Sequence, residues 1–140
     1  MRRGVFACAL LAGCFVHPPT EREQLRDQMR AYHDNMRWRR YGEAASYLPQ
    51  PRRKRFLEQV DDLKDDVEIS DYELLSVANQ GQDRVQVRVA FDWQSKRTGL
   101  LRRTEVDEVW VRVGEAWMLS EMHHRKGEPV PFLDGSSGEK

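Results

Sequence analysis

The sequence predicts an α+β fold in which N-terminal helices pack on a curved, four-stranded antiparallel meander sheet. Two observations lead to this class. Apolar residues recur every three or four positions up to about residue 65, and every second position from Val67 onward. These are the periods of a helix face and of a strand face. Short turn signals separate the later apolar runs, and helices and strands segregated in this way are typical of α+β domains.

The helical part is expected to contain three helices. Thr20 and Glu23 have the spacing of a capping box, in which each side chain accepts a hydrogen bond from the backbone N–H of the other residue. The first helix then carries an apolar stripe at spacings of 4, 3 and 4 residues, formed by Leu25, Met29, Tyr32 and Met36. Gly42 and Pro49 bound a short second helix over residues 43–48, and a third is expected over residues 52–65.

Four strands are expected over residues 67–77, 85–93, 101–113 and 116–122, joined by turns at 79–83, 95–99 and 114–115. The second strand has the clearest alternation of apolar and polar residues, its apolar set being Val85, Val87, Val89, Phe91 and Trp93. In the third strand the apolar phase changes between Val106 and Val109. A β-bulge produces such a change and bends the sheet, so a bulge is expected there.

The order of these elements resembles the nuclear-transport-factor-like (cystatin-like) cone. Two stretches add to the resemblance: Trp38-Arg39-Arg40-Tyr41 late in the first helix, and Glu108-Val109-Trp110 before a Gly-Glu-Ala-Trp hairpin. The resemblance implies a cone domain over residues 20–124 with a pocket between sheet and helices. The glycines, prolines and serines after residue 126 predict a flexible C-terminal tail over 125–140. Another sandwich of helices on a meander sheet is the alternative fold.

The N-terminus resembles a bacterial lipoprotein signal. Met1-Arg2-Arg3 is a positive start, and a short apolar run follows from Val5 to Val16, too short for a membrane-spanning helix. Leu11-Ala12-Gly13-Cys14 matches the lipobox, which implies a signal peptide over residues 1–13, a diacylglyceryl and an N-acyl lipid on Cys14, and a tether over 14–19. A secretory peptide cut after Ala12 or Gly13 is the alternative.

The resemblance also implies where the protein resides. A lipoprotein of this kind is anchored in the bacterial cell envelope, and Phe15 after the lipidated position favours the outer membrane, with the domain facing the periplasm. The chain has 23 basic and 23 acidic residues and no net charge, which argues against a general nucleic-acid binder. Both cysteines lie in the first 14 residues, so neither a disulfide nor a thiolate metal site is expected in the domain.

Polar residues that face the interior of the cone are the candidates for chemistry. Strand parity and the apolar stripe single out Glu108, Glu121, Tyr32 and His33. A carboxylate buried beside an aromatic ring can act as a general base, because burial raises the pKa of its carboxyl. The simpler interpretation is that Glu108 and Glu121 leave the core at the bulge and at the strand end, and that His33 lies on the helix surface.

No cofactor and no metal are expected. His123 and His124 are adjacent on a strand and therefore point to opposite faces, so they do not suit one metal ion. A candidate interaction surface consists of Trp38, Arg39, Arg40, Arg52, Arg53 and Arg55. Its arginines suit anionic headgroups, cell-wall polymers or an acidic partner. The alternative is a solvated helix whose arginines pair with the acidic residues that follow, between Asp61 and Glu68.

Together these features predict a membrane-anchored envelope lipoprotein whose domain is a non-catalytic binding or assembly module. Its expected partner is an envelope protein or a small apolar ligand, and a homodimer through the sheet is common among proteins that resemble it. The alternative is a small-molecule enzyme of the same fold that uses a carboxylate base. The polar content of the pocket distinguishes the two, and the mostly apolar inward residues of the second strand favour binding.

Overall fold

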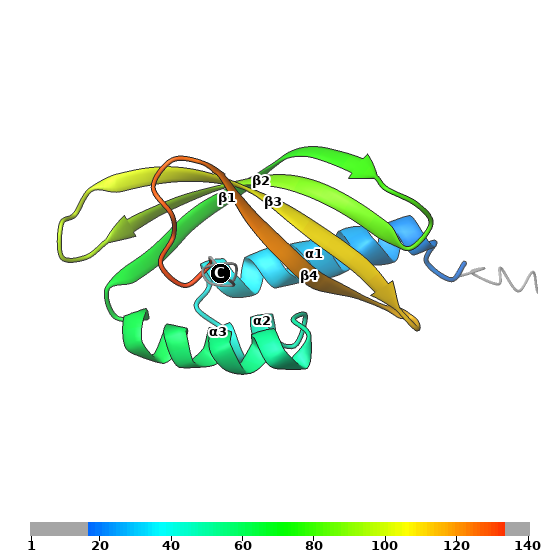
Figure 1. Ribbon diagram of the computed structural model, residues 1–140, viewed down its shortest axis with the longest axis horizontal. Coiled ribbons are helices and arrows are strands. Elements are labelled where there is room, and N and C mark those ends of the chain that lie inside the picture. Colours follow the sequence, from blue (N-terminus) through cyan, green and yellow to red (C-terminus); the bar gives the residue numbers. More distant parts are fainter. Residues whose placement is uncertain (1–16, 134–140) are drawn as a thin grey trace, which may run out of the picture.

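The computed structural model describes residues 17–133 and consists of three helices followed by four strands. The helices are α1 (Glu21–Arg37), α2 (Tyr41–Ala45) and α3 (Gln50–Leu63). The strands are β1 (Val67–Asn79), β2 (Arg84–Ser95), β3 (Leu101–Val113) and β4 (Ala116–Lys126), and they pair antiparallel in the order β1-β2-β3-β4. Figure 1 shows the sheet arching over α1, with α2 and α3 beneath. The predicted α+β class and meander are confirmed. The lipobox and Cys14 lie outside the described residues.

α1 begins and packs as its sequence predicts. The backbone N–H of Glu23 donates to Thr20 Oγ1 over 3.3 Å, and the backbone N–H of Thr20 donates to Glu23 Oε2 over 2.8 Å. The predicted stripe is buried on the inner side of α1, and one further residue, His33, is buried with it. Within residues 17–133 no helix is long and apolar enough to cross a bilayer.

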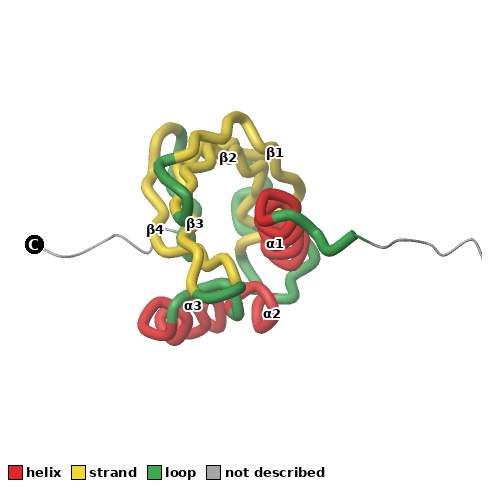
Figure 2. Tube along the Cα trace, turned by 90° about the vertical axis from the view of Figure 1, so that its right-hand side faces the viewer, coloured by secondary structure: helices red, strands yellow, loops and turns green. Residues whose placement is uncertain are grey.

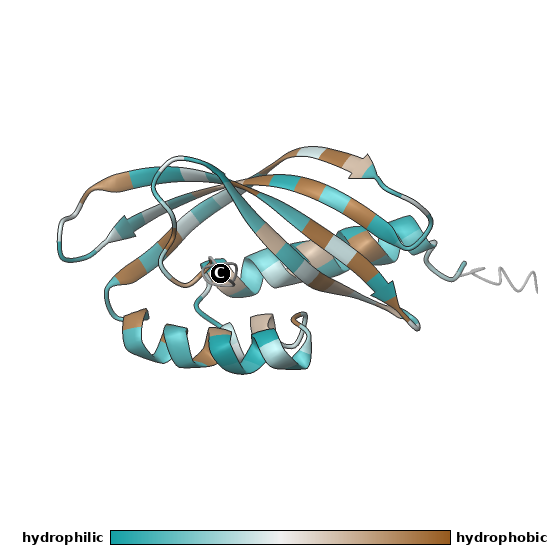
Figure 3. Cartoon of the chain, in the orientation of Figure 1, coloured by the Kyte–Doolittle hydropathy of each residue, from teal (hydrophilic) through white to brown (hydrophobic). Residues whose placement is uncertain are grey.

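The core lies between the concave face of the sheet and the helices. Viewed from the end, the strands curve from β1 round to β4, while α1 lies beside β1, and α2 and α3 close the underside (Figure 2). Brown and teal residues alternate along the strands in Figure 3. The predicted apolar set of β2 is buried: Val85, Val87, Val89, Phe91 and Trp93.

The bulges lie in the edge strands, and the predicted bulge in β3 is wrong. β3 pairs with β2 without a register shift from Val111 to Leu101. The odd-numbered Val109 is buried on the outer face of the sheet. The apolar pattern of β3 therefore changes phase because an apolar residue lies on the outer face, and not because the register shifts. In its pairing with β3, strand β4 has extra residues at Ser120 and Arg125. In its pairing with β2, strand β1 has extra residues at Ser70 and Leu75. Bulges increase local twist and bend a strand, which curves the sheet at both edges.

The segment after the sheet completes the core, so the predicted loose tail from residue 125 is wrong as far as Leu133. β4 continues to Lys126, and Gly127 turns the chain with φ 85°. A Cβ at this glycine would overlap the carbonyl oxygen of Arg103. Val130, Phe132 and Leu133 are then buried, and the Phe132 ring contacts Tyr41 and Phe56 at centroid distances of 5.6 and 6.3 Å. These three side chains cover the end of the core above α2 and α3.

Candidate functional site

The interior of the cone contains a buried pair of titratable side chains, His33 of α1 and Glu108 of β3. His33 Nε2 lies 2.9 Å from Glu108 Oε1, and both side chains have 0% exposure. Two expectations are therefore wrong: that His33 lies on the helix surface, and that Glu108 leaves the core. His33 follows Tyr32 on the buried face of α1, and Glu108 keeps the inward parity of Thr104, Val106 and Trp110 because β3 has no bulge against β2.

Glu108 is fully engaged by its neighbours. Its second oxygen, Oε2, accepts a hydrogen bond of 2.9 Å from Trp110 Nε1. Residues two apart on a strand share a face, so the sequence Glu-Val-Trp places this donor beside the carboxylate. Each oxygen of Glu108 thus has a donor or a ring nitrogen as its partner, as a buried carboxylate requires.

Aromatic rings enclose the imidazole of His33. The Tyr72 ring stacks on it at a centroid distance of 4.8 Å and an interplanar angle of 24°. Tyr32 meets it edge-on at 5.0 Å, and Phe91 lies at 5.7 Å. The other ring nitrogen, His33 Nδ1, is buried and has no hydrogen-bond partner among the described residues. The pair is therefore packed among side chains on every side and has no exposed atom with which to meet a substrate.

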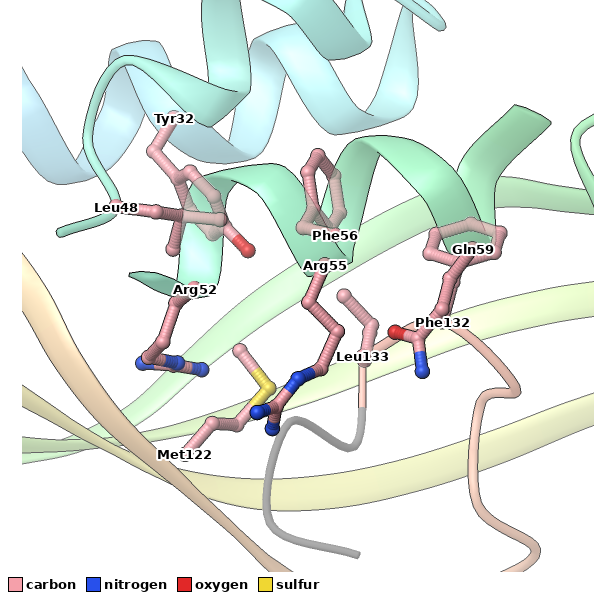
Figure 4. Close-up of a pocket in the computed structure, with 9 residues that line it drawn as sticks. All are labelled: Tyr32, Leu48, Arg52, Arg55, Phe56, Gln59, Met122, Phe132 and Leu133. Atoms are coloured by element: carbon pink, nitrogen blue, oxygen red, sulfur yellow. The ribbon is translucent and has the colours of Figure 1, made fainter. Parts of the chain in front are cut away.

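Tyr32 lies between this pair and a small cavity under α3. Burial raises the pKa of Tyr32 well above its ordinary value, and the nearby charge of Glu108 adds to the rise. The cavity has a volume of about 20 Å³ and is lined by Tyr32, Leu48, Arg52, Arg55, Phe56, Gln59, Met122, Phe132 and Leu133 (Figure 4). Such a volume accommodates a single water molecule. It is far below the ~300–1,000 Å³ of ordinary ligand pockets.

Glu121 does not enter the interior. The extra residue Ser120 in β4 shifts the strand by one position, so Leu119 and Met122 are buried while Glu121 is exposed. Its carboxylate lies 2.9 Å from His123 Nε2 and 3.4 Å from Arg84 Nη2. Both partners lower the pKa of the Glu121 carboxyl, and the hydrogen bond with His123 is the larger cause. The simpler interpretation of Glu121 is confirmed, and Glu121 cannot serve as a base for chemistry inside the cone.

The six residues of the candidate interaction surface are not gathered into one patch. Arg53 donates to the carbonyl oxygens of Ala45 and Leu48, at 3.1 and 3.2 Å, and so caps the end of α2. Arg52 Nη1 donates to the carbonyl oxygen of Leu119 over 3.0 Å, and burial lowers the pKa of this guanidinium. Both are fixed in place by the fold.

The remaining four are exposed: Trp38, Arg39 and Arg40 follow one another after α1, and Arg55 lies on α3. Trp38 has 64% of its surface exposed, and the guanidinium of Arg37 lies 5.4 Å from the centroid of its ring. Arg39 donates to the carbonyl oxygen of Lys64 and lies 3.8 Å from Asp65. Arg40 and Arg55 are exposed, the latter at the rim of the small cavity. Arg39 and Asp65 thus form one of the ion pairs that the alternative interpretation expects.

The described residues contain no cluster of three or more His, Cys, Asp and Glu side chains that would suit a metal ion. His123 bonds to Glu121, and His124 Nε2 lies 2.6 Å from the carbonyl oxygen of Gly127. Each histidine of this adjacent pair thus has a separate local partner.

An apolar opening beside the core lies between α1 and β1, a site that the sequence did not predict. It is a groove of about 370 Å³ lined by Arg22, Leu25, Arg26, Met29, Leu74, Val77 and Asn79. Leu74 and Val77 lie in the predicted first strand. Their place in a groove could not be predicted, because the sequence does not reveal the bulges at Ser70 and Leu75.

Solved structures with the same arrangement of elements are found despite low sequence identity. A ketosteroid isomerase-like protein from Erwinia carotovora atroseptica is 15% identical and has a TM-score of 0.55, over 69% of this chain and 89% of that one. A Xanthomonas campestris protein described as a polyketide cyclase is 10% identical with a TM-score of 0.54, over 75% and 91% of the two chains. The chain has the nuclear-transport-factor-like fold.

A third structure of this fold is described as a Ca/calmodulin-dependent kinase II association domain, from Exiguobacterium sibiricum. It is 15% identical with a TM-score of 0.63, over 81% of this chain and 98% of that one. No protein-family model and no curated protein sequence matches the chain. The nuclear-transport-factor-like fold thus includes proteins named for catalysis and proteins named for association, and fold alone does not choose between these functions.

Tyr72 links the histidine to the surface and provides a test in alkaline solution. Burial, and then the hydrogen bond and charge of Asp34, raise the pKa of Tyr72 from 10.0 to about 12. The phenol therefore stays neutral in the folded chain at pH values where it ionises in the unfolded chain. The contribution of this shift to the free energy of unfolding is complete below pH 10.0 and is lost as the pH rises toward 12. We expect Tyr72→Phe to show a shallower alkaline fall in the free energy of urea unfolding.

The control for this prediction is Tyr47→Phe, whose hydroxyl makes no hydrogen bond to the residues that the structure describes. Its alkaline profile should follow that of the wild type. Identical profiles for Tyr72→Phe and the wild type would contradict the Tyr72–Asp34 contact.

Proposed function

We propose that this chain is a lipid-anchored protein of the bacterial envelope whose domain binds a partner and catalyses no reaction. The observation that carries the binding role is the closed interior of the cone. The only carboxylate that faces the interior among the candidates, Glu108, has 0% exposure and partners on both oxygens. The groove between α1 and β1 instead opens at the surface and is bordered by the exposed Leu74 and Val77 of β1.

The anchor rests on the sequence. Leu11-Ala12-Gly13-Cys14 is the segment that resembles a lipobox, and its cysteine would carry the diacylglyceryl and N-acyl groups. Two or more acyl chains hold a protein on a membrane far more firmly than one, at ~0.8 kcal/mol per buried CH₂. With Phe15 next in the chain, the outer membrane is the proposed location, and the domain would face the periplasm. The short tether over residues 14–19 would hold α1 close to the bilayer.

The alternative is an enzyme of the same fold with Glu108 as base. One observation favours it: the buried His33–Glu108 pair has an unpartnered nitrogen, His33 Nδ1. Buried titratable pairs occur more often at active sites than elsewhere. The closure of the interior argues against it, because a general base must come within hydrogen-bond reach of its substrate.

The anchor is tested by comparing full-length wild type with Cys14→Ala in a bacterial host. We expect the wild type in the membrane fraction, with a mature chain that begins at Cys14 and carries the mass of three acyl chains. Cys14→Ala should appear uncleaved or in the soluble fraction. Equal membrane association of the two proteins, together with a wild type that lacks lipid mass, would overturn the lipoprotein assignment.

A further inference from the structure

α1 and β1 are held together at one end and separate at the other. At the closed end, the hydroxyl of Tyr72 donates to Asp34 over 2.9 Å, and Arg37 lies 3.5 Å from Asp71. At the open end, residues 22–29 of α1 and 74–79 of β1 border the 370 Å³ groove. The floor of the groove is apolar, because the side chains of Leu25 and Met29 belong to the core.

The strand beside this groove has a free edge. β1 is the first strand of the sheet order, and among the described residues its segment 73–79 pairs only with β2. Edge strands are commonly protected by charge or proline, yet here Leu74, Leu75 and Val77 have 40%, 39% and 57% of their surface exposed. Leu74 and Val77 line the groove, whereas Leu75 is the extra residue of a bulge and does not line it.

Three arginines follow the same side of α1. Arg22, Arg26 and Arg30 are spaced four residues apart, which places them in one row. Arg22 and Arg26 line the groove, and Arg30 is close enough to Tyr72 of β1 to influence the pKa of its phenol.

None of these three arginines forms an ion pair within the described part of the chain. The arginines of the sheet, in contrast, each pair with a carboxylate; they are Arg84, Arg88, Arg102, Arg103, Arg112 and Arg125. The row along α1 therefore offers positive charge beside the free edge of β1, with Glu23 close enough to Arg26 for their charges to interact.

From this juxtaposition we infer that the groove binds an extended, acidic segment of a partner protein, which adds to β1 as a fifth strand. The backbone of the segment would pair with the free edge of residues 74–79. Side chains at alternate positions share one face of such a segment. On the face toward α1, apolar side chains would lie over Leu25, Met29, Leu74 and Val77, and carboxylates would meet the row of arginines. The inference rests on the proposed binding function and names the chemistry of the partner; it does not depend on lipid at Cys14.

Charge argues against a second copy of this chain as the occupant. A two-fold pairing of β1 with β1 would set one α1 beside the other, and both rows of arginines would then face each other. Like charges brought together in this way are destabilising. An acidic strand from a different protein has the complementary charge.

The test uses the full-length chain in detergent and labelled peptides of about six residues, the usual length of a strand. The probe carries valine and glutamate on one face of the strand and serine on the other. One control peptide has lysine in place of glutamate, and another is N-methylated at alternate backbone nitrogens and so cannot complete the strand hydrogen bonds. We expect fluorescence anisotropy to show binding of the probe, with affinity at least about tenfold lower for either control.

A matched pair of protein variants tests the position. Arg22→Glu with Arg26→Glu should weaken binding of the probe about tenfold. Lys96→Glu with Arg97→Glu reverses two exposed charges in the turn between β2 and β3, and should leave binding unchanged. Equal losses in the two double variants, or equal binding of the N-methylated peptide, would overturn the inference, since attraction between charges would then explain the affinity without strand addition.

Two further outcomes would also overturn it. One is binding of anionic phosphatidylglycerol vesicles through Arg22 and Arg26 with no binding of the probe, which would make the surface a lipid contact. The other is a dimer in sedimentation that Val77→Lys dissociates, which would make β1 a contact between copies. If the probe peptide does not bind, but the anchored wild type can still be crosslinked to a periplasmic protein through another face, the strand-addition inference fails and the proposed binding function stands. If no partner is crosslinked from any face, both proposals fail.

Discussion

Glu108→Ala is expected to lower the free energy of unfolding by about 3–5 kcal/mol. The substitution removes the partner of His33 Nε2 and of Trp110 Nε1, both of which lie 2.9 Å from the carboxylate. These polar atoms are buried, and each group left unsatisfied costs about 1–3 kcal/mol. Urea unfolding followed by tryptophan fluorescence measures the loss, since Trp110 itself reports on the site.

The matched control is Glu105→Ala, three residues earlier in β3. Glu105 is partly exposed and makes no ion pair among the described residues, so its loss should stay below about 1 kcal/mol. Glu108→Gln should fall between the two, because the amide keeps one acceptor oxygen but presents a donor to the second N–H. A Glu108→Ala protein as stable as the Glu105→Ala control would contradict the buried pair.

Phe132→Ala is expected to cost about 3–5 kcal/mol of the free energy of unfolding, the usual range for a buried phenylalanine. Phe132 has 1% of its surface exposed and contacts both Tyr41 and Phe56. Its removal would leave a cavity at the end of the core, between the C-terminal segment and α3. Thermal or urea unfolding measures the effect.

Pro131→Ala is the control for this prediction, since Pro131 is exposed next to Phe132. It should change the free energy of unfolding by less than about 1 kcal/mol. If Phe132→Ala and Pro131→Ala had the same small effect, the segment after Gly127 would not be part of the core.

The periods of apolar residues predicted the elements well because they report directly on burial. The stripe from Leu25 to Met36 identified α1, and the alternation from Val85 to Trp93 identified β2. The bulges were not predictable in the same way. In the pairing of β3 with β4, the extra residues are Ser120 and Arg125, both polar residues on a partly polar strand, so the pattern of apolar residues does not reveal them. The buried tail was missed because two prolines and a glycine surround Val130 and Phe132 and resemble a loop.

The candidate site was predicted only in part. Strand parity placed Glu108 on the inner face, and the structure confirms that parity. That Glu108 would stay buried depended on its contact with His33, which is 75 residues away in the chain and belongs to no local motif. The arginines of the candidate interaction surface were still less informative about function. Arg52 and Arg53 bind backbone carbonyl oxygens, whereas the unpaired row on α1 was hidden within an ordinary amphipathic helix.

The central proposal, that this domain binds a partner at the surface beside β1, is tested most directly by photocrosslinking in cells. A photoreactive amino acid replaces Val77 in the groove in one full-length protein and Arg97 in the turn between β2 and β3 in another. The account predicts a discrete adduct with an envelope protein from position 77 and none from position 97. Adducts from neither position, or equally from both, would contradict it.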